Sequence, residues 1–454
     1  MVVQIKKSSH LVFGCLLTLL LGLVFVRYSF GINIPGILLT AVVIAIAALG
    51  NRDEIIAILM CCIPLHEAID LYITLAVCSV ILIVKAFHQI RIGPIVVLCI
   101  LIVVWEILHF FMVGFDLKLM ITSVIPFVFL AVFLSCDMSD IDYAFIIRSV
   151  AISAILVGLM LLGNCIVNAN FNFTVAFSNL KRLGHLSEED ILNGGAIHPN
   201  ILGVINIVSA SALFQLHSVG KHKKTDYISI VLLITIGVLT SSRTFLVCLL
   251  LMFFLLVVGY NGSIKQKIRF VGVLLIFSVI SLLLLYWIFP DVLEYYIGRF
   301  FGDDIFTDRN NLIVQYHRFI SANEKVMLFG VGANNLPLKA INIYNVADVV
   351  PHNSIQEIIV AWGIPGLIMV GSLIVMMILE SKKYSKKIRI LNCIPLAVII
   401  VKSMAGQLIT SGYTLLALAL AYLSLCQDFR LEKKQIKDYS EARYLPGVDG
   451  KMVK

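Results

Sequence analysis

Apolar runs of the kind that cross a lipid bilayer recur along the whole chain, and they constrain its fold more than any other feature. A spanning helix needs about 20 mostly apolar residues, because the bilayer core offers no water to satisfy backbone groups. With 60% hydrophobic and only 14% charged residues, the chain has too little polar material to cover a soluble surface. The sequence therefore predicts an all-α polytopic membrane protein.

Hydropathy predicts about fourteen spans, several of them shorter than the roughly 20 residues of a perpendicular helix. The candidates are Leu11–Val26, Ile32–Gly50, Ile55–Leu65, Leu71–Val84, Pro94–Gly114, Leu117–Ser135, Ala144–Val167, Pro199–Leu216, Tyr227–Thr240, Phe245–Gly259, Phe270–Phe289, Ile355–Leu379, Ile390–Val401 and Leu408–Leu425. Ile55–Leu65 is the weakest, and we keep it because Pro64-Leu-His66-Glu67 resembles a turn. We expect about 12–14 transmembrane helices in all.

Lysine and arginine predict the orientation, because they accumulate in cytoplasmic loops. If the N-terminus is inside, nearly all basic clusters fall on one side, from Lys6 and Lys7 to the run that begins at Lys382. Both termini are then cytoplasmic. The expected domains are residues 1–289 with the N-terminal spans, 290–353 as a large extracytoplasmic loop, 354–425 with the C-terminal spans, and 426–454 as a basic cytoplasmic tail.

The extracytoplasmic loop is predicted to carry an amphipathic helix that rests on the membrane-embedded body. Apolar residues recur there at helical spacing, namely Leu312, Ile313, Tyr316, Phe319 and Ile320. Thr307 or Asp308 would cap the helix, which places Arg309 at the start of the apolar face. His317 and Arg318 lie off that face and are expected in solvent, although Arg318 could still meet an anionic substrate.

Arg243 is the sharpest single candidate for a functional residue. It lies in the outer turn Ser241-Ser242-Arg243-Thr244, between two runs of only about fifteen residues, below the length that a span needs. The tip of this hairpin is therefore expected to be recessed, and an ionisable group at membrane depth usually has a functional partner. A guanidinium suits phosphate oxygens. An arginine that snorkels to lipid headgroups from an ordinary turn explains the pattern equally well.

His352 comes just before a predicted helix. Ser354-Ile-Gln-Glu357 matches a capping box, so Glu357 is expected to bond back to the cap rather than to act in catalysis. A neutral imidazole ahead of a helix N-terminus can orient or deprotonate a hydroxyl, but a loop histidine bonded to backbone is the simpler interpretation. Gly363-Ile-Pro-Gly366 should break the helix, so that Ser354–Trp362 lies at the interface before the chain enters the membrane.

Other motifs point to structure rather than chemistry. Residues 329–335 are glycine-rich but follow no clear strand, so we interpret them as a tight turn. Asn200 is expected to cap or start a span. The ten cysteines show no CxxC or zinc-ligand spacing and are predicted to be small packing residues. We expect no metal and no cofactor. No basic stripe interleaved with aromatics points to nucleic acid.

In their order and shared outer side, these motifs resemble those of the O-antigen ligase and O-antigen polymerase family of bacterial membrane proteins. The resemblance covers roughly residues 195–371 and rests on His198-Pro-Asn200-Ile-Leu-Gly203, Ser242-Arg243-Thr244, Asp308-Arg309, Leu328-Phe-Gly330-Val-Gly332-Ala-Asn334, His352-Asn353 and Gly363-Ile-Pro-Gly366. The N-terminal half matches only in being hydrophobic.

The resemblance implies a metal-independent inverting glycosyltransferase of the polytopic GT-C type, in the bacterial cytoplasmic (inner) membrane. Its donor would be a glycan on undecaprenyl pyrophosphate, and its partners a glycan acceptor, the bilayer and other polysaccharide-assembly proteins. Arg243, with Arg309, would bind the pyrophosphate, and His352 would activate or position the acceptor hydroxyl. Arg318, Asn353 and Asn200 are further candidates for substrate contacts.

We therefore expect a polysaccharide polymerase that joins lipid-linked repeat units. The close alternative is a ligase that transfers the glycan to lipid A core, protein or another acceptor, and these motifs do not separate the two. A non-catalytic transporter or flippase would need charged residues spread along a pathway through the bundle. Glu106 and Arg148 are the only expected exceptions to a clustering of charge on the outer face.

Overall fold

The computed structural model describes residues 2–86, 90–113, 117–138, 141–173, 175–176, 182–184, 197–218, 223–259, 307–333, 351, 353–381, 386–406, 408 and 411–427, with isolated positions between 265 and 298. Over this part of the chain the regular structure is helical, apart from one isolated bridge between Ile90 and Cys136. The predicted span Phe270–Phe289 lies almost entirely outside the described residues.

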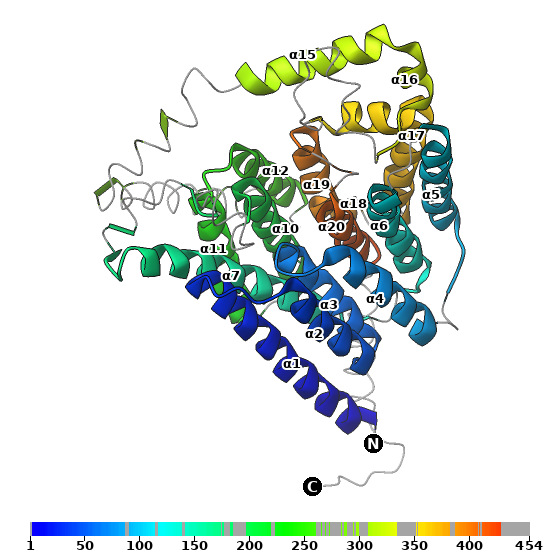
Figure 1. The fold of residues 1–454 in the computed structure, drawn as a ribbon. Coiled ribbons are helices and arrows are strands. Elements are labelled where there is room, and N and C mark those ends of the chain that lie inside the picture. The colour runs from blue at the N-terminus through cyan, green and yellow to red at the C-terminus, as the bar shows by residue number, and fades with distance from the viewer. Residues whose placement is uncertain are drawn as a thin grey trace.

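The helices fall into an N-terminal and a C-terminal set (Figure 1). The first set is α1 (Val2–Phe30), α2 (Gly36–Leu49), α3 (Arg52–Leu65), α4 (Leu71–Ala86), α5 (Pro94–Val113), α6 (Leu117–Ser135) and α7 (Tyr143–Asn168). The second set is α10 (Pro199–Ser218), α11 (Lys224–Leu239), α12 (Arg243–Gly259), α15 (Thr307–Ala322), α16 (Glu324–Phe329), α17 (Ser354–Glu380), α18 (Lys386–Asn392), α19 (Ile394–Met404) and α20 (Gly412–Leu425).

Several of these helices are long and apolar enough to cross a membrane. Among the described residues, five helices, α1, α5, α7, α10 and α17, meet that condition by length and composition. Shorter apolar helices accompany them, including α2, α4, α12, α19 and α20. The predicted class, an all-α polytopic membrane protein, is confirmed.

α3 lies at the centre of the bundle and explains why it is the weakest predicted span. Every residue from Asp53 to Leu65 is buried, and α3 packs against α7, α20 and α2 (Figure 1). Asn51 and Glu54 form a capping box at its start. Because protein rather than lipid surrounds it, α3 needs neither full span length nor high hydropathy. The turn predicted at Pro64–Glu67 follows directly.

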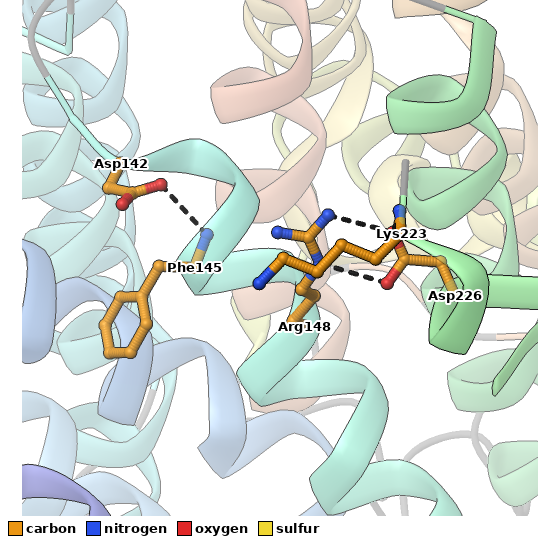
Figure 2. A network of polar contacts seen from close by, with 5 residues as sticks. All are labelled: Asp142, Phe145, Arg148, Lys223 and Asp226. Atoms are coloured by element: carbon orange, nitrogen blue, oxygen red, sulfur yellow. Dashed lines mark hydrogen bonds and ion pairs between the residues drawn. The ribbon is translucent and has the colours of Figure 1, made fainter. Parts of the chain in front are cut away.

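Arg148, one of the two charges predicted near a span interior, is explained by an ion pair between α7 and α11. Its Nε and Nη2 donate to the two carboxylate oxygens of Asp226 at 3.0 and 2.9 Å (Figure 2). Asp226 also accepts from the backbone N of Lys223 at 2.8 Å. The fork-to-fork geometry satisfies both buried groups, so this charge joins two helices instead of marking a transport pathway.

α17 is broken at Gly363, as predicted. Gly363 has φ +66°, a left-handed conformation inside an otherwise helical segment. The break releases the carbonyls of Val360 and Ala361, which accept from Val331 N at 2.8 Å and Gly332 N at 2.7 Å. In Figure 1 the first part of α17 runs across the end of the bundle before the second part turns into it.

The glycine-rich segment after α16 is therefore more than the tight turn that we predicted. Gly330, with φ +81°, packs directly on the break in α17, where a Cβ atom would lie 2.3 Å from Ala361 O. His109 Nε2 contacts Phe329 O at 2.6 Å, and Trp105 Nε1 donates to Trp362 O at 3.1 Å. α5 thus holds both halves of this junction.

α15 is the amphipathic helix predicted in the large loop. Tyr316, Phe319 and Ile320 are buried, whereas His317 and Arg318 are exposed, as expected. Gln356 Nε2 donates to Ile313 O at 2.8 Å and ties α15 to the first turn of α17. α15 lies at the end of the bundle opposite the start of α1 (Figure 1).

Candidate functional site

A cavity of about 700 Å³ opens where several helix ends meet. Its walls come from the α3–α4 turn, the first turns of α10 and α12, and the connection from α19 to α20. Its polar lining residues are His66, Glu67, Asp70, His198, Asn200, Thr244, Lys402 and Ser411, with Tyr72 and Tyr413 as the aromatic ones. Each of these segments is on the side that the span pattern predicts to be extracytoplasmic.

The turn that carries Arg243 is recessed in the protein. Thr240, Ser241 and Ser242 are buried, and Arg243 is half-buried at the start of α12. Leu183 N donates to Leu239 O at 2.9 Å, so the segment before α10 covers the turn. The predicted recess is confirmed. Because Thr244, the next residue, lines the cavity, Arg243 lies beside it.

Asn200 belongs to the same cavity although it comes from a different motif. It lies in the first turn of α10, and its Oδ1 accepts from Arg182 Nη2 at 3.2 Å. Gly203, one turn later, allows α10 to approach α12, because a Cβ there would lie 3.1 Å from the Cβ of Phe245. The structure thus brings the predicted candidates Asn200 and Thr244 to one wall.

The start of α17 differs from our prediction by one residue. Asn353, not Ser354, is the cap, and its Oδ1 accepts from Ile355 N at 2.9 Å and Gln356 N at 3.3 Å. Glu357 does not close a capping box, because its Oε2 accepts from Leu408 N at 2.7 Å instead. The predicted box is wrong, since a cap one position earlier frees the Glu357 carboxylate for a long-range contact. The predicted substrate contact of Asn353 stays a prediction.

Two contacts attach the start of α17 to the cavity wall. Ser354 Oγ donates to Ser403 O at 2.7 Å, and the Glu357 carboxylate holds Leu408, on either side of the lining residue Gly406. Both groups are buried. His352 lies outside the described residues, and its role stays a prediction, but its neighbour Asn353 is one residue from this attachment.

The two arginines of α15 are less closely tied to the cavity. Arg309 lies in the first turn of α15, and Arg318 is exposed on that helix. α15 reaches the site through α17, by the Gln356 contact to Ile313 O. Their predicted contacts with substrate stay predictions.

Three lining residues were missed from the sequence. Lys402 is buried, and its Nζ donates to Thr414 Oγ1 at 3.0 Å and lies 4.8 Å from the Tyr413 ring centroid. His66 Nε2 lies 3.2 Å from Glu67 Oε1, and this contact lowers the pKa of Glu67 below the ordinary carboxyl value. A lysine at the outer end of a span departs from the positive-inside pattern, and that signal could have identified Lys402.

Comparison with known families identifies the central part of the chain. Residues 228–371 match the family model of O-antigen ligases. This stretch is an O-antigen ligase domain. It begins in α11 and ends in α17, so it includes Arg243, α15, the glycine-rich segment and the break at Gly363. A comparison with curated proteins finds no match.

The O-antigen ligase domain supports the family assignment made from the motifs and gives the chain a glycosyltransferase-like function of the O-antigen ligase and polymerase type. The matched stretch contributes Thr244 to the cavity, whereas Asn200, Lys402 and the His66–Glu67 pair lie outside it. The site therefore joins the O-antigen ligase domain to helices on both sides of it.

Proposed function

We propose that the protein is a surface-polysaccharide polymerase that joins undecaprenyl-pyrophosphate-linked repeat units at the outer face of the cytoplasmic membrane. The observation that carries the proposal is the shared cavity of Asn200 and Thr244, beside Arg243 and next to the attached start of α17. Two motifs of the resemblance, distant in sequence, adjoin one space large enough for part of a glycan.

The proposed reaction is a single inverting displacement. A hydroxyl oxygen of the acceptor sugar attacks the anomeric carbon of the donor. The new glycosidic C–O bond forms while the C–O bond to pyrophosphate breaks, and the bonding electron pair leaves with the pyrophosphate. His352 takes the hydroxyl proton, and Arg243, with Arg309, holds the charge of the leaving group.

Arg243 suits this role for a physical reason. A half-buried guanidinium has fewer competing water contacts than an exposed one, and its planar fork matches two phosphate oxygens at once. Because the pyrophosphate leaves with its own charge, the proposed step needs no metal.

Product analysis separates this proposal from its alternatives. Purified protein is reconstituted in liposomes with polyprenyl-pyrophosphate-linked repeat units alone, and then with a separate lipid-linked or protein acceptor. A polymerase makes longer lipid-linked chains from repeat units alone. Product that appears only with the separate acceptor identifies a ligase. Movement of the lipid across the bilayer without a new glycosidic bond identifies a transporter and contradicts the proposal.

A further inference from the structure

The cavity beside the O-antigen ligase domain has an acidic wall. Glu67 and Asp70 both come from the α3–α4 turn. Asp70 is fixed by its backbone, since its N donates to Thr40 Oγ1 at 2.7 Å, and its Oδ1 accepts from Ile73 N at 3.0 Å. Two carboxylates on one rigid turn repel a pyrophosphate, whereas they are good acceptors for hydroxyl groups.

An aromatic surface lies next to this wall. The ring of Tyr413 is buried and its centroid lies 4.8 Å from that of His66. Tyr72, half-buried, also lines the cavity. The negative face of an aromatic ring attracts polarised C–H groups, and its area excludes water from a ligand that lies on it. Acceptors beside aromatic rings suit a ligand that carries both hydroxyls and C–H faces.

The charges of the lining residues separate the possible ligands. Lys402 contributes one positive charge, and its Nζ already contacts Thr414 and the Tyr413 ring. Glu67 and Asp70 contribute two negative charges, so at neutral pH the three groups together do not attract an anion. A neutral ligand that both donates and accepts hydrogen bonds fits this lining better than a phosphate.

We propose that this cavity is a saccharide subsite, in which the carboxylates of Glu67 and Asp70 accept hydrogen bonds from sugar hydroxyls and Tyr413 supports a sugar face. The inference rests on the proposed function, since it divides the lipid-linked substrate between two places. The pyrophosphate is held at Arg243 and a sugar at the α3–α4 turn. The sugar may belong to the donor or to the acceptor, and both have the same chemistry.

Binding measurements on the full-length protein in nanodiscs test the subsite directly. The probes are polyprenyl pyrophosphate without sugar, the same lipid bearing one repeat unit, and the free repeat-unit oligosaccharide. Glu67→Gln removes the charge of the acceptor and keeps its size, and Glu324→Gln, an exposed glutamate on α16, is the matched control. Loss of a charged hydrogen bond weakens binding roughly tenfold.

We expect Glu67→Gln to weaken binding of the two sugar-bearing probes about tenfold and to leave the sugar-free lipid unchanged. Tyr413→Leu should do the same, while Tyr413→Phe, which keeps the ring, should bind like the wild type. Unchanged binding of the sugar-bearing probes, or an equal loss for the sugar-free lipid, overturns the subsite. Varying donor and acceptor separately then identifies the bound sugar by whose KM rises in Glu67→Gln.

Failure of the subsite and failure of the proposed function remain distinguishable. If wild-type protein binds the sugar-free lipid and makes polymer while Glu67→Gln is unaffected, only the subsite is wrong. If wild-type protein makes no glycosidic bond yet binds the free oligosaccharide in a Glu67-dependent way, the proposed function is wrong and the subsite stands.

Discussion

Glu106 and Trp362 are joined by a buried hydrogen bond in which Trp362 Nε1 donates to Glu106 Oε2 at 2.6 Å. The same oxygen accepts from Ala333 N at 2.8 Å. Glu106 on α5 therefore holds the residue before the break in α17 and the end of the glycine-rich segment together. This explains the second charge predicted in a span interior, because it satisfies buried donors.

Replacement of Glu106 by alanine is expected to destabilise this junction. It leaves two buried N–H donors without their acceptor, at about 1–3 kcal/mol each. The apparent melting temperature in detergent should fall strongly for Glu106→Ala and less for Glu106→Gln, which keeps one carbonyl oxygen. Similar melting temperatures for all three proteins would show that the contact contributes little.

Gly330→Ala and Gly363→Ala should both be more harmful than Gly371→Ala. At Gly330 a Cβ would lie 2.3 Å from Ala361 O, and at Gly363 it would lie 2.6 Å from Leu328 O, with positive φ at both positions. Gly371 lies later in α17 with no atom within 4 Å of its Cβ position, so alanine there should be neutral or stabilising by up to about 1 kcal/mol. Melting curves of the three variants provide the test, and the reverse order would refute the docking of the two segments.

The ion pair of Figure 2 gives a second matched comparison. Asp226→Asn leaves the Arg148 guanidinium, whose side chain is 20% exposed, without its carboxylate, and should cost about 1–3 kcal/mol. Asp137→Asn removes a pair with Arg91, whose side chain is 81% exposed, and should cost about 0–1 kcal/mol. Chemical denaturation in detergent measures both. A larger loss for Asp137→Asn is the contrary result.

Acidification should remove the contribution of Glu67. Its pKa is lowered by the hydrogen bond to His66, against the opposing effect of burial. A carboxyl group whose pKa is lower in the folded protein stabilises it fully above the unfolded pKa of about 4.3, and this stability is lost as the pH falls through the folded value. The difference in melting temperature between wild type and Glu67→Gln should therefore shrink below about pH 4. A difference that grows on acidification would contradict the lowered pKa.

Much of the fold followed from local sequence patterns. Helical spacing predicted the buried face of α15, Gly363 and Pro365 predicted the break in α17, and two short apolar runs predicted the recessed turn at Arg243. Each of these depends on residues close together in sequence. The same local reasoning failed by one residue at the start of α17, because Asn353 and Ser354 are both suitable caps.

Contacts between distant segments could not be predicted in this way. The glycine-rich segment looked like an ordinary turn because its partners, the Val360 and Ala361 carbonyls, become available only when α17 breaks. Lys402, His66 and Glu67 meet in the cavity because α3, α19 and α20 pack side by side, which no single stretch encodes. Glu357 attracted interest as a capping residue, and its contact to Leu408 depends on that same packing.

The central claim, that Arg243 binds the pyrophosphate beside this cavity, is tested most directly by transfer in proteoliposomes. The substrate is a polyprenyl-pyrophosphate-linked repeat unit, and the readout is both longer lipid-linked glycan and released polyprenyl pyrophosphate. Arg243→Ala should slow both at least about 100-fold, as loss of a charge-stabilising group does, with partial recovery in Arg243→Lys. Arg91→Ala, at an exposed arginine outside the cavity, should act like wild type. Wild-type rates of both products in Arg243→Ala would contradict the account.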